Sequence, residues 1–258
     1  MSPSAVVQSE DELKHRTSIP EQPITERNPP LVPESEVDEN GKVNNYAVPR
    51  ANVAATREAP NGTEKDQYNY INRKKTVLEQ HCVWFDRDND GVIWPIDTWR
   101  TVREFGWGIR LSLFFTCFLH LVQSWGTVPW FFLIPDPLFR VWIHNIHNNK
   151  HGSSTLAFDN EGRFRPQFFD EYFARNDKDG KGGLTFWEGY QGLRNIRFAW
   201  DIFGQISAFF EWGMTYVLIW PEDGIVRKED ARRVLDGSIF HEMTTSHRKY
   251  DAEKSMTW

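Results

Sequence analysis

The twelve residues from Asp86 to Asp97 constrain the fold more than any other stretch of the chain. Carboxylates stand at positions 1, 3, 5 and 12 and a glycine at position 6, which is the spacing of an EF-hand calcium loop. Three carboxylates so close together repel one another unless a hard cation lies between them, and Gly91 permits the sharp turn around it. The spacing predicts a calcium site between two helices; the alternative is an acidic turn without an ion.

The predicted calcium ligands are Asp86, Asp88, Asp90, the backbone carbonyl of Val92, and Asp97. Trp94 stands at position 9 and cannot ligate, so a water molecule is expected in its place. Position 12 holds an aspartate where glutamate usually supplies two oxygens. Because aspartate is one methylene shorter, we expect a smaller shell and weaker discrimination against magnesium.

A second loop, from Asp177 to Glu188, follows the same spacing with Lys181 at position 5. An ammonium cannot ligate a cation, so we expect Lys181 to serve as an internal counter-ion. EF-hands usually pair, which would bring Ile93 and Leu184 side by side in a short ladder. The predicted fold class is mainly α, with one intact and one degenerate EF-hand joined by a two-stranded β ladder, plus apolar helices at a membrane surface.

An apolar segment at 109–140 follows the first loop and is broken by Pro129, Pro135 and Pro137. Neither of its two apolar arms reaches the roughly 20 residues that a membrane-spanning helix needs, and the prolines oppose one continuous span. The pattern is typical of a segment that dips into a lipid surface; the alternative is a buried helix with a packed loop. Tryptophans flank the arms as interfacial aromatics do, which favours lipid.

The first 65 residues differ in composition from the rest, with eight of the fourteen prolines and one aromatic residue, Tyr46. Such a segment cannot bury enough apolar surface to offset its chain entropy, so a disordered tail is predicted at 1–65. We divide the remainder into four parts. These are a calcium-binding unit at 66–108, the lipid-anchoring segment at 109–140, a part with histidines, degenerate loop and C-terminal helices at 141–250, and a flexible tail at 251–258.

Further features narrow the possible functions. Two cysteines form no disulfide framework, and the net charge of -6 without a basic cluster predicts no nucleic-acid partner. Residues 195–220 are apolar nearly throughout, but Glu211 within the run argues against a membrane span and favours a buried or lipid-lying helix. Residues 221–230 suggest a third, eroded acidic loop.

Four histidines are candidates for a metal or haem. His144, His147 and His151 are spaced three and four residues apart, which places them on one face if a helix continues that far. His81 shares a helix face with apolar residues, five positions before Asp86. An imidazole on an apolar face is more often a hydrogen-bonded core residue than a ligand, so spacing alone leaves their roles open.

Seven motifs carry a resemblance to a known family: His81–Gly91, Asn145–Ser154, Glu161–Phe164, Gly182–Glu188, Phe203–Gly204, Glu211–Trp212 and Asp236–Phe240. In order and spacing the chain resembles the caleosins, a family of lipid-droplet peroxygenases, over about residues 66–250. The long proline-rich N-terminus resembles the fungal members. Two departures are that Asp97 closes the calcium loop and that Arg140 stands where the family often has a proline.

The resemblance implies a calcium-dependent haem peroxygenase with calcium and haem b as cofactors. Such enzymes transfer oxygen from a fatty acid hydroperoxide to an unsaturated fatty acid or another lipid acceptor. By motif, the catalytic and haem-binding histidines fall on His81 and His151, with His147 a third cofactor-binding candidate. We expect His81 to be the proximal ligand.

The resemblance also implies a place on the lipid-droplet surface or the endoplasmic reticulum membrane, facing the cytosol, and leaves self-association open. Two competing functions remain. One is a non-catalytic calcium-binding coat or tethering protein of lipid droplets, in which the histidines are structural. The other is a soluble calcium sensor that exposes an apolar groove to a partner helix.

Overall fold

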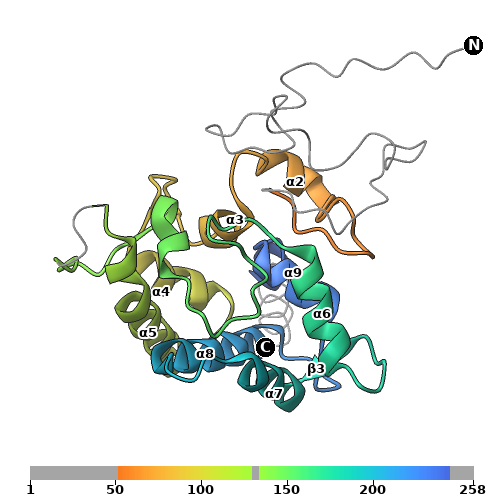
Figure 1. The fold of residues 1–258 in the computed structure, drawn as a ribbon. Coiled ribbons are helices and arrows are strands. Elements are labelled where there is room, and N and C mark those ends of the chain that lie inside the picture. Colours follow the sequence, from red (N-terminus) through yellow and green to blue (C-terminus); the bar gives the residue numbers. More distant parts are fainter. Residues whose placement is uncertain (1–51, 130–133, 245–258) are drawn as a thin grey trace, which may run out of the picture.

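The computed structural model describes residues 52–129 and 134–244. Helices dominate, accompanied by two small antiparallel sheets of two strands each (Figure 1), so the predicted mainly α class is confirmed. The elements in order are η2 (Lys65–Gln67), α2 (Tyr68–Ile71), α3 (Val77–Val83), β1 (Val92–Ile93), α4 (Pro95–Glu104), α5 (Ile109–Thr127), β2 (Val141–Trp142), η3 (Ile143–Asn149), α6 (Pro166–Asn176), β3 (Gly183–Thr185), α7 (Phe186–Ile196), α8 (Ile202–Ile219), β4 (Ile225–Arg227) and α9 (Lys228–Leu235).

Helix–loop–helix units pair through these short strands. β1 pairs with β2, with Ile93 opposite Val141, and β3 pairs with β4, with Leu184 opposite Val226. The predicted ladder between Ile93 and Leu184 is therefore wrong. Each acidic loop pairs with the loop that follows it in the chain: the first with the proline-broken segment, and the second with the eroded loop at 221–230.

Four loops of the described chain share one turn geometry. The backbone is left-handed two positions before Ile93, Val141, Leu184 and Val226. The φ angles there are 82° at Gly91, 53° at Phe139, 78° at Gly182 and 74° at Gly224. Three of these residues are glycines, which adopt a positive φ without steric cost. Phe139 is not a glycine, so the sequence pattern does not reveal its loop, from Asp136 to Arg140, which we call the concealed loop.

Asp136 organises the concealed loop. Its carboxylate accepts bonds from the backbone N–H groups of Leu138 (3.2 Å) and Arg140 (3.0 Å), and from Nε of the Arg140 side chain at 2.8 Å. Burial alone would raise the pKa of this carboxyl, but the Arg140 bond and the backbone donors outweigh it and lower the pKa. Arg140 thus neutralises this loop from within the chain, at the position where the family often has a proline.

Helix α5 buries polar residues and exposes apolar ones. Its buried residues are all polar: Ser112, Thr116, His120, Ser124 and Thr127. Five large apolar residues are 47% to 65% exposed: Ile109, Leu113, Phe114, Leu121 and Trp125. In water this distribution is the reverse of the normal one, while small polar residues at helix contacts and apolar residues outside are typical of helices in contact with lipid.

The first and last parts of the described chain pack against each other. α9 packs against α3 (Figure 1), and residues 52–63, which belong to the predicted disordered tail, pack on the core. Ala54 is buried, and its carbonyl accepts a bond of 3.1 Å from Arg232 of α9. The disordered tail is therefore wrong for 52–63, because its small apolar residues find a surface that α3 and α9 form together. Residues 1–51 and 245–258 lie outside the described residues.

Two local structures fix how the chain enters α3 and η3. A turn at 72–76 separates α2 from α3. The Thr76 hydroxyl begins α3 by accepting the backbone N–H of Glu79, and the Glu79 carboxylate accepts the backbone N–H of Thr76. Strand β2 leads directly into the 3₁₀ helix η3. The strand forms because this stretch supplies the ladder partner of Val92 and Ile93.

Of the helices described, α8 alone is long and apolar enough to cross a membrane by length and composition. It carries Glu211 at its middle. Its large exposed residues near the N-terminal end, Ile202, Phe203 and Ile206, are more than half exposed.

Candidate functional site

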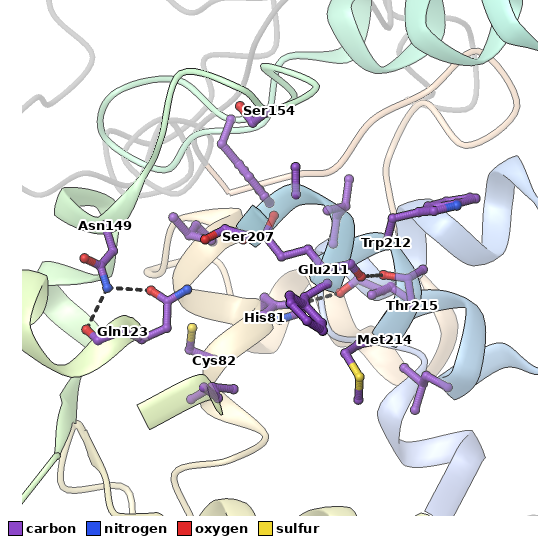
Figure 2. A pocket seen from close by; sticks show the side chains of 18 of the residues that line it. His81, Cys82, Gln123, Asn149, Ser154, Ser207, Glu211, Trp212, Met214 and Thr215 are labelled. Carbon is purple, nitrogen blue, oxygen red and sulfur yellow. Dashed lines mark hydrogen bonds between the residues drawn. The ribbon is translucent and has the colours of Figure 1, made fainter. Parts of the chain in front are cut away.

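An apolar cavity of about 350 Å³ lies between the paired units. Side chains from α3, α5, α8 and α9 line it, together with residues 149–158. Aromatic rings line it, among them Phe85, Phe105 and Phe240. Its polar groups include His151 and the labelled His81 and Glu211 (Figure 2). The size and the few convergent polar groups are those of a small-molecule or cofactor site.

The position of His81 is fixed by a backbone bond between the two ends of the chain. Its Nδ1 lies 2.7 Å from the carbonyl oxygen of Val234 in α9. Because a carbonyl only accepts, Nδ1 carries the proton and Nε2 keeps its lone pair. Among the described residues, none bonds Nε2. Burial lowers the pKa of His81 and outweighs that backbone bond and the nearby carboxylates, so the imidazole is neutral.

Cys82, the neighbour of His81, also lines the cavity. Burial, followed by the charge of Glu79, raises the pKa of its thiol to about 12. The thiolate is the form that binds metal, and the raised pKa disfavours that form. The neutral imidazole beside it is the better donor.

His151 lies at a second point of the cavity and pairs with α8. Its Nε2 is 3.5 Å from Oε1 of Glu211, while its buried Nδ1 has no hydrogen-bond partner among the described residues. Burial lowers the pKa of His151, but the contact with Glu211 and the charge of Asp201 outweigh it, so the pKa is raised. The family resemblance gives His81 and His151 the same role. In the structure they differ, because His81 is neutral and bonded to a backbone carbonyl, whereas His151 is paired with a carboxylate.

The remaining two histidines do not join this site. His147 lies in η3 and does not line the cavity. The imidazole of His144 is 89% exposed and lies 3.7 Å from Glu79 at the surface. The single helix face predicted for His144, His147 and His151 does not form, because η3 ends at Asn149.

The acidic loop brings Asp86, Asp88 and Asp90 together, with one oxygen of each within 4.8 Å of the others. Asp86 is nearly buried and accepts the backbone N–H groups of Asp90 (3.2 Å) and Gly91 (2.9 Å). Burial, and then the charges of Asp90 and Asp88, raise the pKa of Asp86 despite these bonds. In the described chain no lysine or arginine pairs with the three carboxylates.

Asp97 is buried but stands apart from these three carboxylates. Its Oδ2 accepts the backbone N–H of Trp94 at 3.2 Å, which fixes the start of α4. Val92 belongs to β1, opposite Trp142. The Asp86–Asp90 cluster is therefore preformed, while the two remaining predicted ligands, Val92 and Asp97, serve the ladder and the helix cap.

The second acidic loop holds a cation of its own chain. Nζ of Lys181 lies 2.7 Å from Glu188 and 3.2 Å from Asp177. The bond from Lys181 lowers the pKa of Glu188, and backbone N–H groups together with Lys181 lower that of Asp177 against the effect of burial. The predicted role of Lys181 as an internal counter-ion is confirmed.

Sequence reasoning missed two parts of the site. Glu211 stood in a family motif and interrupted an apolar run, but no role for it followed from the sequence, although a carboxylate within such a run marks a position with a polar partner. The sequence does not indicate a role for Val234, because its backbone carbonyl, not its side chain, orients His81. A contact of that kind depends on the tertiary fold alone.

Paired helix–loop–helix units around a histidine-bearing apolar cavity define the class of this protein, and comparisons place it more closely. The family model described as "Caleosin related protein" matches residues 73–244. The chain is 35% identical over 197 residues to a peroxygenase of Lilium longiflorum, covering 76% of this chain and 80% of that one. This chain belongs to the caleosin family.

Two proteins of Arabidopsis thaliana are also similar. One, named probable peroxygenase 4, is 28% identical over 72% of this chain and 94% of its own length. The other, named probable inactive peroxygenase-like protein, is 32% identical over 55% of this chain and 66% of its own length. No solved structure gave a significant match.

Proposed function

We propose that the protein is a haem peroxygenase of a lipid surface, which transfers oxygen from a fatty acid hydroperoxide to an unsaturated lipid. The observation that carries this proposal is the neutral His81 imidazole in the apolar cavity, with Nδ1 held by the Val234 carbonyl. Histidines that ligate metals usually donate their other N–H to such an acceptor. The names of the lily and Arabidopsis relatives support the reaction.

The residues of the cavity fit haem b with His81 as the protein ligand to iron. Its Nε2 keeps a lone pair, burial raises the pKa of the neighbouring Cys82 thiol, and aromatic rings line the site. Nε2 of His151 is engaged by Glu211, so we do not assign His151 to the metal. Haem, when bound, supplies the oxygen-transfer chemistry, while the protein supplies the ligand, access and polarity.

The cavity suits a lipid hydroperoxide in two respects. Its apolar lining excludes water and accommodates an acyl chain, for which the aromatic residues Phe105, Trp107 and Phe115 offer contact area. His151 and Glu211 offer polar contacts to the hydroperoxide group. The overall reaction converts the hydroperoxide to an alcohol and the alkene to an epoxide.

Calcium is the proposed ion of the Asp86–Asp97 loop, with Val92 and Asp97 completing the ligands. Three carboxylates meet there without a protein cation, whereas Arg140 and Lys181 neutralise the two neighbouring loops. A bound cation would reverse the effect that raises the pKa of Asp86. His81 and Phe85 both contact Phe240, at centroid distances of 5.3 and 5.5 Å, so order in the loop extends to the imidazole.

The inverted helix α5 supports a lipid-droplet or endoplasmic reticulum surface as the location. Its apolar outer face and the exposed residues at the start of α8 lie on neighbouring helices, whose Phe118 and Phe210 rings are 4.5 Å apart. Because these helices also line the cavity, a lipid substrate would have a short path from the surface to His81. The cytosol-facing orientation stays part of this proposal.

A non-catalytic coat is the second candidate function. The similarity to a protein named as an inactive peroxygenase-like protein favours it, because the same fold then exists without turnover. In a coat protein, the outer face of α5 would suffice and the cavity would need no cofactor.

Haem reconstitution separates the two functions. Purified protein loaded with haem b is expected to show a Soret band and to convert linoleate hydroperoxide to its alcohol with oleate as acceptor. His81→Ala is expected to lose both the band and the turnover, whereas His144→Ala, a change at an exposed position, retains both. Wild-type protein that floats with droplets but takes up no haem would favour the coat.

A further inference from the structure

The polar end of the cavity contains a carboxylate–imidazole pair that haem ligation by His81 does not use. Nε2 of His151 lies 3.5 Å from Glu211, and the His151 side chain is 9% exposed. Its Nδ1 is buried and has no partner among the described residues. A buried nitrogen without a partner is costly in an apolar site, which indicates that a ligand atom completes it.

The setting of Glu211 is unusual for a structural ion pair. It lies in the apolar helix α8, lines the cavity, and its side chain is 55% exposed. Exposed ion pairs contribute little to stability, so stability alone does not explain a carboxylate there. Burial lowers the pKa of His81, and the charge of Glu211, which lies in the cavity with His81 (Figure 2), partly opposes that effect. Glu211 therefore acts on both cavity histidines.

The loop of His151 is held to the start of α8 independently of this pair. Asp201 accepts the backbone N–H of Ser153 at 2.9 Å and caps α8 through Gly204. Phe198 packs against Gly152, where an added Cβ would lie 2.3 Å from the ring. These contacts fix the backbone of the loop, so Glu211 is left to set the orientation and charge of the imidazole.

The charged groups around His151 are few. Glu211 and Asp201 favour its protonated form. Lys150 is adjacent in sequence, but its ammonium donates to the carbonyls of Phe158 and Asp159. His81 is neutral and donates to Val234. Glu211 is therefore the group whose removal changes the proton affinity of His151 most directly.

We propose that His151 and Glu211 form the proton-transfer pair of the cavity, in which Nδ1 of His151 exchanges a proton with the hydroperoxide and Glu211 positions the imidazole through Nε2. The inference rests on the proposed peroxygenase function. His151 is the catalytic residue, since it would touch the hydroperoxide. Glu211 is a positioning residue.

The proposed pair would carry one proton through the reaction and return it. The hydroperoxide gives its proton to Nδ1 of His151, so an O–H bond breaks and an N–H bond forms. The same proton returns to the alkoxide oxygen when the O–O bond breaks, which yields the alcohol. The distal oxygen ends in the epoxide, and no further oxidant or reductant is needed. Glu211 stabilises the imidazolium between the two transfers.

Glu211→Gln tests the pair, with Glu222→Gln, an exposed position outside the cavity, as the matched control. In haem-free protein, the pKa of His151 is followed by NMR and should fall by about one unit in Glu211→Gln, because an opposite charge is lost. In haem-loaded protein, Glu211→Gln should retain the haem content and Soret band. Its kcat should fall about 100-fold, the usual loss when general acid–base catalysis is impaired.

Two further measurements distinguish proton transfer from a structural role. The acidic limb of the kcat–pH profile should move to lower pH in Glu211→Gln, and Glu211→Asp should restore part of the rate. Cyanide, which must lose its proton as it binds iron, should bind more slowly to haem-loaded Glu211→Gln than to wild type. The control variant should match wild type in every measurement.

The outcomes separate this inference from the proposed function. Turnover by wild type with an unchanged kcat and pH profile in Glu211→Gln would overturn the pair alone. Loss of haem from Glu211→Gln would also overturn it, since the carboxylate would then support the cofactor site. Haem-loaded wild type without any turnover would overturn the proposed function, and the pair with it.

Discussion

Nε2 of His120 accepts a hydrogen bond of 2.8 Å from the hydroxyl of Thr98, and both side chains are buried. The opposite nitrogen of the ring, Nδ1, donates to the carbonyl of Phe139 at 2.6 Å. One neutral imidazole thus joins α4, which leaves the acidic loop, to α5 and to the concealed loop. The histidine that interrupts the apolar segment therefore joins the helix that leaves the acidic loop to helix α5 and to the turn at Phe139.

Replacing His120 with leucine should destabilise the protein by about 2 kcal/mol, because Thr98 and the Phe139 carbonyl then stay buried without partners. Burial lowers the folded-state pKa of His120, against the effect of its backbone bond. The unfolded chain therefore binds more protons below about pH 6.5, and stability falls as the pH drops below that value. Denaturant melts at pH 5 to 7.5 should show a smaller slope in His120→Leu, and an equal slope would contradict this role.

Asp86→Asn should lower calcium affinity at least about tenfold, since it removes a charge from the loop ligands. Asp177→Asn is the matched control, because Lys181 occupies the equivalent loop. Isothermal titration of the folded proteins with calcium and with magnesium measures both. Equal losses in the two variants would mean that the second loop also binds an ion.

Removing calcium with a chelator should weaken the Soret band and the turnover together. The reason is the aromatic contact chain from Phe85 through Phe240 to His81, which loses its ordered end when the loop carboxylates repel. Absorbance and activity are followed in the same sample, and calcium is then restored. If calcium leaves while both signals persist, the loop and the haem site are independent.

Asp136→Ala should destabilise the fold by about 2 to 3 kcal/mol, because it removes an almost fully buried carboxylate and strands its donors. Asp223→Ala, which removes the exposed partner of Arg227, should cost little. Because the folded pKa of Asp136 is lowered, its contribution is present above about pH 4 and is lost as the pH falls further. Thermal melting of both variants at pH 3 to 7 provides the comparison.

Paired serine substitutions at Leu113 and Leu121 should weaken flotation with phospholipid-coated droplets severalfold, because each removes apolar area from the outer face of α5. Their side chains are 54% and 64% exposed, so the fold should be retained. Ile71→Ser, at an exposed position on α2, is the control. Unchanged flotation of the paired variant would show that α5 is not the lipid contact.

The sequence predicted the features that local chemistry determines. The clustering of Asp86, Asp88 and Asp90 and the counter-ion role of Lys181 follow from residue types at fixed spacing. The ladder partners did not, because the loop around Phe139 has neither glycine nor the acidic pattern, and only its backbone turn reveals it. The inverted face of α5 was not predicted, although the polar residues from Ser112 to Ser124 recur at intervals of four; their burial in the structure shows it.

The contact between His81 and Val234 has a consequence for how the protein matures. His81 lies in the first helix–loop–helix unit and Val234 in the last helix, so the imidazole is oriented only after the two ends of the chain have docked. During synthesis, Val234 emerges 153 residues after His81. If the proposed function holds, haem captured by a nascent chain would meet an unoriented ligand, and we expect productive insertion to follow closure of the fold.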